Sequence, residues 1–246
     1  MQYYGKTDIG MHRKENQDRV EVPNDNNKLK LFIVADGMGG ANAGGVASQM
    51  AIEYVKNSII DGIEETGYER ENLEQLLRKA IVDANRYVYN KSKANSEYAG
   101  MGTTISVALV IKNNVYIGHV GDSRIYRLRK HIMRQLTKDH SYVQELLKNK
   151  TITKEEAENH PQKNILLKVL GCESEIEPDI MVKGFVKDDI LLMCSDGLTN
   201  MIDKDDIHEI ITDGKHNLKE TCNILVSRAK ENGGYDNISV ILISND

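Results

Sequence analysis

Three aspartates stand where apolar segments of the chain meet Gly or Asn, and they are the first residues whose type and position suggest chemistry. Asp36 and Asp196 each follow an apolar run and precede Gly, whereas Asp236 precedes Asn and a third apolar run. Carboxylates at the mouth of an apolar core repel one another and are costly to desolvate, and a divalent cation with oxygen ligands relieves both costs. The pattern therefore predicts that the three carboxylates meet at one metal site.

A simpler interpretation competes with the metal site. Asp-Gly and Asp-Asn are ordinary turn pairs, because Asp and Gly favour turns for purely local reasons. Any one of the three aspartates, taken alone, is more simply read as a turn residue. Three such pairs at strand ends favour the metal site, but spacing alone leaves both interpretations open.

The glycine-rich segment 37–45 lies between an expected strand and an expected helix, where a phosphate-binding loop could sit. A P-loop would end in Gly-Lys-Ser/Thr, which is missing, and a dinucleotide fingerprint would need Gly in place of Asn42. We therefore expect no nucleotide site. The glycines are better explained as residues that allow close backbone approach near the aspartates.

Two further segments carry polar side chains. In segment 7–18, Arg13 offers a planar fork suited to two phosphate oxygens, and Asp18 is another carboxylate, although a solvated charged turn explains this segment equally well. Residues 121–124, Gly-Asp-Ser-Arg, include Asp122 and lie between two expected strands. A hairpin turn is the default interpretation of that segment.

Composition limits the classes of function. The 246 residues, 40% of them hydrophobic, can bury a sizeable core, and no linker-like or repetitive segment marks a domain boundary. The net charge of -5 provides no broad basic surface for a phosphate backbone, so we expect no nucleic-acid partner. Three widely spaced cysteines form neither a disulfide framework nor a zinc motif, which favours a reducing, cytoplasmic compartment. We expect a monomer.

No segment is typical of a targeting or membrane sequence. The first residues, MQYYGKTDIG, lack the charged and apolar regions of a signal peptide. The longest apolar run, 105–111, is far shorter than a membrane-spanning helix. We therefore expect no membrane insertion.

Hydrophobic periodicity predicts an α+β fold. Apolar residues from Leu73 to Val88 keep the spacing of a long amphipathic helix. The polar segment 139–164 contains Thr153 with Glu156 three residues on, a capping-box pattern that indicates a helical insert. Further helices are expected at 45–60, 204–211 and 218–231. Strands are expected at 30–35, 103–111, 115–121, 123–129, 131–136, 176–182, 189–194 and 238–243. The four from 103–111 to 131–136 are expected to form an antiparallel meander with a turn at Asn113-Asn114.

Read together and in order, six segments resemble the metal-dependent protein phosphatases of the PP2C (PPM) family, in their compact bacterial serine/threonine form. The resemblance covers essentially the whole chain, and six motifs in order are specific although each alone is weak. The segments are TDIGMHRKENQD (7–18), VADGMGG (34–40), GTT (102–104), GDSR (121–124), CSDGL (194–198) and GYDNISV (234–240).

The resemblance implies a four-layer α-β-β-α sandwich, in which two central antiparallel β-sheets are flanked by helices. A single phosphatase domain would span residues 1–246, with 139–164 in the place of the family's flap, a segment linked to substrate choice. The resemblance also implies a centre of two Mn²⁺ or Mg²⁺ ions at one end of the sandwich, and it leaves a third ion open.

The resemblance assigns roles to the residues of the first ion. By motif position, Asp36 would bridge both ions and Gly37 would contribute its carbonyl oxygen. Asp196 and Asp236 would complete the shell of the first ion. The three aspartates singled out from their strand-end positions thus fall on the family's metal ligands.

Three more residues match family positions. Asp18 would serve the second ion, directly or through water. Asp122 matches a ligand of the third ion, with Asp196 shared. Arg13 matches the arginine that binds the substrate phosphate.

The activity implied is hydrolysis of phosphoserine and phosphothreonine in proteins, by in-line attack of a metal-bridging hydroxide and without a phosphoenzyme. The implied partners are proteins phosphorylated on Ser or Thr, including the cognate bacterial Ser/Thr kinase that the enzyme would oppose. A phosphatase that resets a single signalling protein is a close alternative. A pseudophosphatase acting as a binding module is a different class, disfavoured because every expected carboxylate is present. A structural or nucleotide-binding domain is disfavoured by the missing Gly-Lys-Ser/Thr.

The general acid is where the chain departs from the family. Many relatives carry a His in or just after the Asp-Gly segment, where this chain has Met38 and Ala41. His12 is a weak substitute, because adjacent residues on a strand point to opposite faces. We expect His119 and Cys194 to be packed strand residues rather than catalysts. Metal-bound water could protonate the leaving group instead.

Overall fold

The computed structural model describes residues 1–24, 29–40, 43–213 and 217–246, and its centre is a pair of five-stranded antiparallel sheets. The first sheet contains, in spatial order, β1 (Gln2–Asp8), β12 (Ile238–Asn245), β11 (Asp189–Cys194), β8 (Arg124–Arg129) and β9 (Ile132–Gln135). The second contains β10 (Asp179–Gly184), β7 (Asn114–Val120), β6 (Ile105–Ile111), β3 (Lys30–Ala35) and β2 (Arg19–Glu21). A separate short pair joins β4 (Gly37–Met38) to β5 (Gly102–Thr103).

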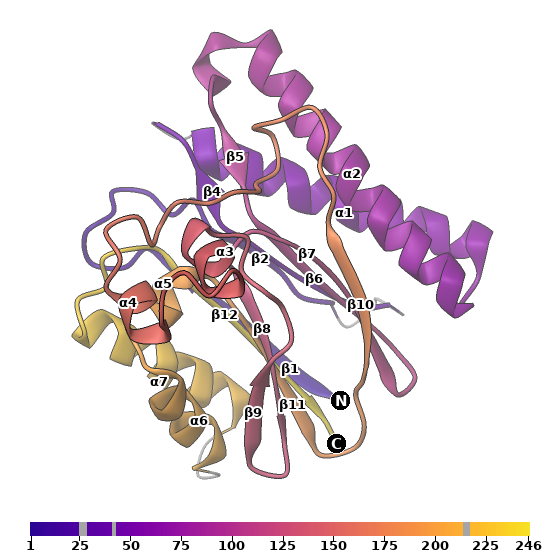
Figure 1. Cartoon of the computed structure of the whole chain (residues 1–246). Helices are drawn as coiled ribbons and strands as arrows, with labels where there is room; N and C mark the ends of the chain where they lie inside the picture. Colours follow the sequence, from indigo (N-terminus) through magenta and orange to yellow (C-terminus); the bar gives the residue numbers. More distant parts are fainter. Residues whose placement is uncertain (25–28, 41–42, 214–216) are drawn as a thin grey trace.

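Helices cover the outer face of each sheet, as Figure 1 shows. The long helices α1 (Ala43–Thr66) and α2 (Arg70–Ala94) pack on the second sheet, and α6 (Lys204–Thr212) and α7 (Leu218–Glu231) pack on the first. The expected four-layer α-β-β-α sandwich is therefore confirmed. Among the described residues, no helix combines the length and apolar character needed to cross a membrane. The shorter helices are η1 (Ser96–Tyr98), α3 (Tyr142–Lys148), α4 (Lys154–Glu158) and α5 (Asp196–Thr199).

Strand β3 shows why its sequence reads as one continuous apolar run. Phe32 and Val34 point into the core between the two sheets, whereas Leu31, Ile33 and Ala35 point into the core beneath α1 and α2. Because both faces of the strand are buried, the usual alternation of apolar and polar residues is lost. This central strand carries Asp36 at its end.

The predicted four-strand meander is wrong at its midpoint. Strand β7 pairs with β6 and β10 in the second sheet, whereas β8 pairs with β11 and β9 in the first. Segment 121–123 is therefore a crossover between sheets rather than a hairpin turn, and Gly121 begins it with a φ of 110°. The crossover places Asp122 at the same end of the sandwich as Asp36.

Several boundaries also differ from the prediction. The β6–β7 turn is formed by Lys112-Asn113, one residue earlier than expected, because Ile111 pairs with Asn114 and Lys112 takes a φ of 53°. The expected strand 103–111 is divided between β5 and β6 at Thr104. Strand β10 begins three residues later than expected, and the sequence patterns did not indicate β1 or β2. The Thr153–Glu156 capping box is present at the start of α4.

Candidate metal centre

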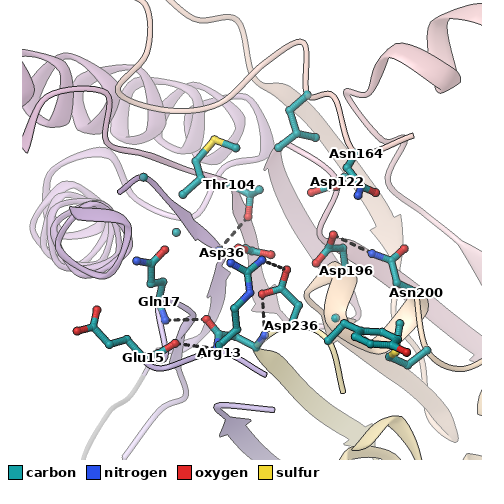
Figure 2. Close-up of a pocket in the computed structure, with 18 of the residues that line it drawn as sticks. Arg13, Glu15, Gln17, Asp36, Thr104, Asp122, Asn164, Asp196, Asn200 and Asp236 are labelled. Atoms are coloured by element: carbon teal, nitrogen blue, oxygen red, sulfur yellow. Dashed lines mark hydrogen bonds and ion pairs between the residues drawn. The ribbon is translucent and has the colours of Figure 1, made fainter. Parts of the chain in front are cut away.

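Strand geometry brings the aspartates together at one end of the sandwich. Asp36 directly follows β3, Asp196 begins α5 two residues after β11, and Asp236 precedes β12. Strands β11 and β12 are antiparallel neighbours, so the end of one lies beside the start of the other. All three carboxylates line a pocket of about 900 Å³ (Figure 2). The remaining lining residues are Arg13, Lys14, Glu15, Gln17, Gly37, Met38, Gly39, Thr104, Asp122, Lys163, Asn164, Leu166, Gly197, Asn200, Met201, Tyr235 and Asn237.

The glycine that follows each of the first two aspartates allows close backbone approach, as expected from the sequence for Gly37. A Cβ at Gly37 would lie 2.1 Å from the carbonyl oxygen of Gly44, at the start of α1. A Cβ at Gly197 would lie 1.9 Å from the carbonyl oxygen of Asn237. Both distances are impossible for a real side chain, so Gly197 is what allows the segments of Asp196 and Asp236 to touch.

Thr103 and Thr104 fix the backbone at Asp36. The Asp36 amide donates to Thr104 Oγ1 at 3.0 Å, and its carbonyl oxygen accepts from the Thr104 amide at 2.8 Å. The Thr103 hydroxyl donates to the same carbonyl at 2.9 Å. These bonds use only the main-chain groups of Asp36, so its carboxylate is available to the pocket.

Arg13 contacts one of the aspartates directly. Its Nη2 donates to Asp236 Oδ2 at 2.7 Å, and this bond raises the pKa of Arg13 (Figure 2). Asn237 holds the segment that carries Arg13, since its side-chain amide donates to the carbonyls of Ile9 and Glu15 and accepts from the amide of Gln17. The N-terminal segment is thereby tied to the aspartate's own loop.

Asp18 lies behind the pocket and not in its lining. Its side chain is fully buried, and Oδ2 accepts from the Ser195 hydroxyl at 2.7 Å. Ser195 in turn accepts from the Ser239 amide at 3.0 Å, so strand β12 orients the hydroxyl. Asp18 is thus held against the residue that precedes Asp196.

Two buried carboxylate oxygens lack a hydrogen-bond partner among the described residues, namely Asp18 Oδ1 and Asp196 Oδ1. The other oxygen of Asp196 accepts from Asn200 Nδ2 at 2.9 Å. An unsatisfied buried carboxylate oxygen is costly, and a cation would satisfy it. The atoms proposed to ligate the metal are all carboxylate or carbonyl oxygens, which suit hard cations such as Mn²⁺ or Mg²⁺. The residues therefore fit a divalent metal.

Crowding of carboxylates shows in their pKa values. Burial raises the pKa of Asp18 to about 7, although hydrogen bonds from Ser195 and Ser239 oppose the shift. Burial and the nearby Asp196 raise the pKa of Asp122 to about 8. Burial, followed by repulsion from neighbouring carboxylates, also raises the pKa of Asp36 and of Asp196. Positive charge placed among these groups would oppose every one of these shifts.

The carboxylates share a pocket without forming a closed ligand set. Across the described part of the chain, no three His, Cys, Asp or Glu side chains stand as a ready-made group for one ion. Of the residues predicted for the site, Arg13, Asp36, Gly37, Asp122, Asp196 and Asp236 line the pocket, and Asp18 lies buried behind it.

Segment 139–164, which we expect to act as a flap, reaches the pocket at its C-terminal end. Lys163 and Asn164 belong to the lining. The segment is fastened at its start, where the His140 amide donates to the Gly121 carbonyl at 2.7 Å. Beyond its end, the amides and carbonyls of Leu170 and Thr103 pair with each other. The start of segment 139–164 is therefore held one residue from Asp122.

Neither histidine considered as a general acid lines the pocket. The His12 ring stacks on Tyr235, with centroids 4.8 Å apart, and does not belong to the pocket lining. His119 is confirmed as a packed strand residue, because its ring pairs with the Ser106 hydroxyl and burial lowers its pKa to about 4. Met38 lines the pocket, whereas Ala41 and Asn42 lie outside the described residues.

Cys194 is confirmed as a buried strand residue. Burial raises the pKa of its thiol to about 12, so the thiol stays protonated and is no nucleophile.

Sequence reasoning missed the residues that hold the aspartates in place. Thr104, Ser195, Asn200 and Asn237 each hydrogen-bond to an aspartate or to the segment of one. Three of them fall within segments already noted for their aspartates or glycines. Polar residues directly beside a candidate ligand were the available signal.

Comparison with known proteins gives the family. A family model described as "Protein phosphatase 2C" matches residues 11–230. A curated relative, the serine/threonine phosphatase Stp of Listeria monocytogenes, is 42% identical over 243 residues, which cover 98% of this chain and 94% of the relative.

Solved structures agree with this assignment. The serine/threonine phosphatase of Streptococcus agalactiae superposes with a TM-score of 0.92 at 37% identity, covering 100% of this chain and 99% of that one. The catalytic domain of the phosphatase PstP, described in complex with two manganese ions, gives a TM-score of 0.84 at 30% identity, covering 98% and 96%. This chain therefore belongs to the protein phosphatase 2C family, and it is a metal-dependent serine/threonine protein phosphatase.

Proposed function

We propose that the aspartates hold two divalent cations and that these cations, with Arg13, carry the hydrolysis. The observation that carries the proposal is the pair of buried carboxylate oxygens, Asp18 Oδ1 and Asp196 Oδ1, without a hydrogen-bond partner among the described residues. Asp36 would serve both ions with the Gly37 carbonyl beside it. Asp196 and Asp236 would serve one ion and Asp18 the other.

When bound, the cations would supply Lewis acidity that activates a water for in-line attack on phosphorus. The chain's own contribution is positioning and charge. The Arg13 guanidinium presents parallel N–H donors that match two phosphoryl oxygens, so it would orient the phosphate and stabilise its developing charge. The threonines that clamp the Asp36 main chain would keep its carboxylate aimed into the pocket. No side chain is required as a nucleophile.

The finer assignments belong to the same proposal. Asp122 would hold a third ion with Asp196, supported by its place in the pocket lining. We favour Mn²⁺ over Mg²⁺ because a similar phosphatase, PstP, is described with manganese. The leaving alkoxide would take its proton from water at the site, because the thioether of Met38 has no proton to donate.

The wider role proposed is removal of phosphate that a bacterial Ser/Thr kinase has added to proteins. Residues 1–246 would act as one phosphatase domain, with 139–164 as a flap that influences substrate choice. A cytoplasmic location is supported by three cysteines that are free thiols. A monomer is also part of the proposal, and size-exclusion chromatography with light scattering tests it.

Phosphate release from a phosphothreonine peptide tests the central proposal. Wild-type protein should release phosphate with added Mn²⁺ and should stop after chelation, whereas Asp36→Asn should remain inactive at every Mn²⁺ concentration. Parallel titration with Mg²⁺ compares the two metals, and isothermal calorimetry counts the ions bound. Wild-type protein that bound no divalent cation, or an Asp36→Asn variant as active as wild type, would refute the proposed centre.

A further inference from the structure

Three exposed side chains form a ledge beside the pocket, which we call the aromatic ledge: Met11, His12 and Tyr235. Met11 is 61% exposed and Tyr235 is 62% exposed, although both are large and apolar. The rings of His12 and Tyr235 stack with their planes 25° apart. Tyr235 also belongs to the pocket lining, so the ledge is continuous with the site.

The ledge is held in a defined position by a pair of glycines. A Cβ at Gly233 would lie 2.6 Å from the Tyr235 ring, and one at Gly234 would lie 2.9 Å from Met11 Cγ. Both side chains therefore rest on bare backbone. The Met11 amide donates to the Gly234 carbonyl at 2.8 Å, which joins the two segments. Preorganised exposed groups lose less conformational entropy when they bind a partner.

Two residues of the ledge are sequence neighbours of the Arg13–Asp236 ion pair. His12 precedes Arg13 and Tyr235 precedes Asp236, and the two pairs contact each other, by ring stacking and by the 2.7 Å ion pair. An extended chain advances about 3.3–3.6 Å per residue. Residues close in sequence to a phosphorylated residue at Arg13 can therefore reach the ledge.

We propose that the aromatic ledge binds an apolar side chain, preferably aromatic, within about three residues of the phosphorylated serine or threonine. This inference rests on the proposed function, because the pocket must hold the phosphate for the flanking chain to reach the ledge. The occupant is thus an extended segment of the phosphoprotein substrate.

The charges nearby favour an apolar flank over a basic one. An arginine flank could also stack on a tyrosine ring, but the next two residues along the chain from His12 are the cations Arg13 and Lys14. Lys14, which lines the pocket, would repel a basic side chain on the ledge, whereas Arg13 is already paired with Asp236. Stacked or edge-on contact with Tyr235 adds about 0.5–1.5 kcal/mol for an aromatic partner, which corresponds to about twofold to tenfold in affinity.

The test compares two phosphothreonine peptides of matched sequence, one with Phe and one with Ala at the positions flanking phosphothreonine. Hydrolysis-resistant difluoromethylene phosphonate versions give dissociation constants with Mn²⁺-loaded enzyme by fluorescence anisotropy. The Phe peptide should bind wild type about twofold to tenfold more tightly. Tyr235→Ala should remove this preference, and Tyr235→Phe should keep it. Tyr68→Ala, at a tyrosine that is 56% exposed outside the pocket lining, should keep it too.

A minimal substrate separates this inference from the proposed function. N-acetyl-phosphothreonine methylamide has no flanking side chains, so its Mn²⁺-dependent hydrolysis reports on the metal centre alone. If wild type fails to hydrolyse it while the Phe preference stands, the proposed centre is wrong and the ledge is a binding surface. Equal affinity of wild type for the two peptides, or a preference that survives in Tyr235→Ala, overturns the ledge.

Discussion

The Arg13 guanidinium lies 2.7 Å, from Nη2 to Oδ2, from the Asp236 carboxylate. A side chain expected to bind phosphate therefore contacts a carboxylate expected to bind a cation. A cation bound at Asp236 Oδ2 would compete with Arg13 for that oxygen, and release of Arg13 would free its guanidinium for the phosphate. In the proposed centre, the pair would thus link metal binding to substrate binding.

Replacement of Arg13 should separate these two roles. Arg13→Ala should raise KM for a phosphopeptide, with a fall in kcat as well if the guanidinium stabilises the transition state. The same change should tighten Mn²⁺ binding by up to about fivefold, because a partly exposed ion pair contributes at most about 1 kcal/mol. Steady-state kinetics and calorimetric Mn²⁺ titration measure the two effects.

Lys14→Ala is the matched control, since it removes the same charge from the lining of the same pocket. It should change Mn²⁺ affinity less than Arg13→Ala does. An Arg13→Ala enzyme with wild-type kcat/KM would show that the arginine has no role in phosphate binding.

Sequence patterns predicted the layered fold and most of its strands because buried strands and amphipathic helices leave periodic signals. The patterns did not indicate β1, whose residues are mostly half-buried and which depends on pairing with β12 across the whole length of the chain. The Gly121–Arg124 segment was expected to be a hairpin because local turn chemistry cannot show which sheet each flanking strand joins. Only the tertiary pairing of β7 and β8 decides it.

For the site, strand-end position indicated the aspartates, but their convergence depended on long-range contacts. Gly197 meets the Asn237 carbonyl, and Ser195 meets Asp18, across separations that no local pattern encodes. The ordered motifs supplied that information indirectly. The ion pair between Arg13 and Asp236 had no sequence signal, since neither residue type nor spacing identifies a partner 223 positions away.

Asp36→Asn should stabilise the chelated protein while abolishing activity. The Asp36 pKa is raised well above its usual value by burial and then by neighbouring carboxylates, so the ionised group is unfavourable in the fold without a cation. A neutral amide removes that cost. In EDTA at pH 8 the melting temperature of Asp36→Asn should be higher than that of wild type. Its Mn²⁺-dependent phosphate release should be lower by at least about a hundredfold, because replacing a residue that only supports a metal ligand already lowers activity by up to about that factor.

Asp189→Asn provides the contrast. Both of its oxygens accept from Arg129, at 2.7 and 2.6 Å, and although burial opposes it, the net effect lowers the pKa of Asp189. This variant should lose stability and keep its activity per folded molecule. A fall in melting temperature for Asp36→Asn comparable to that of Asp189→Asn would contradict the repulsion described at the site.

The stability of the chelated protein should fall as pH rises from about 4 to about 8. The folded-state pKa values of Asp18 and Asp122 are raised, to about 7 and about 8, above the ordinary value of 3.8. The folded protein therefore holds protons that the unfolded chain has already released. The stabilisation is complete at a pH below the pKa of these aspartates in the unfolded chain. It is lost as the pH rises to their pKa in the folded protein, by up to about 1.4 kcal/mol per pH unit for each proton.

Mn²⁺ should reverse this trend, because the metal binds deprotonated ligands and releases their protons. Apparent Mn²⁺ affinity should accordingly rise with pH through 7 to 8. Calorimetry in buffers of different ionisation enthalpy counts the protons released on binding. The Asp18→Asn variant should release fewer protons and show a flatter stability profile in EDTA. Equal proton release by wild type and Asp18→Asn would show that Asp18 does not titrate with metal binding.

Ser195 should act on the metal centre through Asp18. Its hydroxyl donates the 2.7 Å bond to Asp18 Oδ2, so Ser195→Ala would remove this donor from a fully buried carboxylate whose Oδ1 already lacks a partner among the described residues. Loss of one such bond costs about 1–3 kcal/mol of stability, and loss of a supporting contact weakens metal binding about 10-fold to 100-fold. The Mn²⁺ concentration for half-maximal activity should rise by that factor, while kcat at saturating Mn²⁺ should recover.

Ser106→Ala controls for loss of a buried serine as such. Ser106 is also fully buried, and its hydroxyl pairs with the His119 ring at 2.9 Å instead of with a site carboxylate. This variant should lose stability to a similar degree without a shift in the Mn²⁺ dependence. If both variants required the same Mn²⁺ concentration as wild type, the Ser195 hydroxyl would have only a structural role, and Asp18 would hold its orientation through the fold alone.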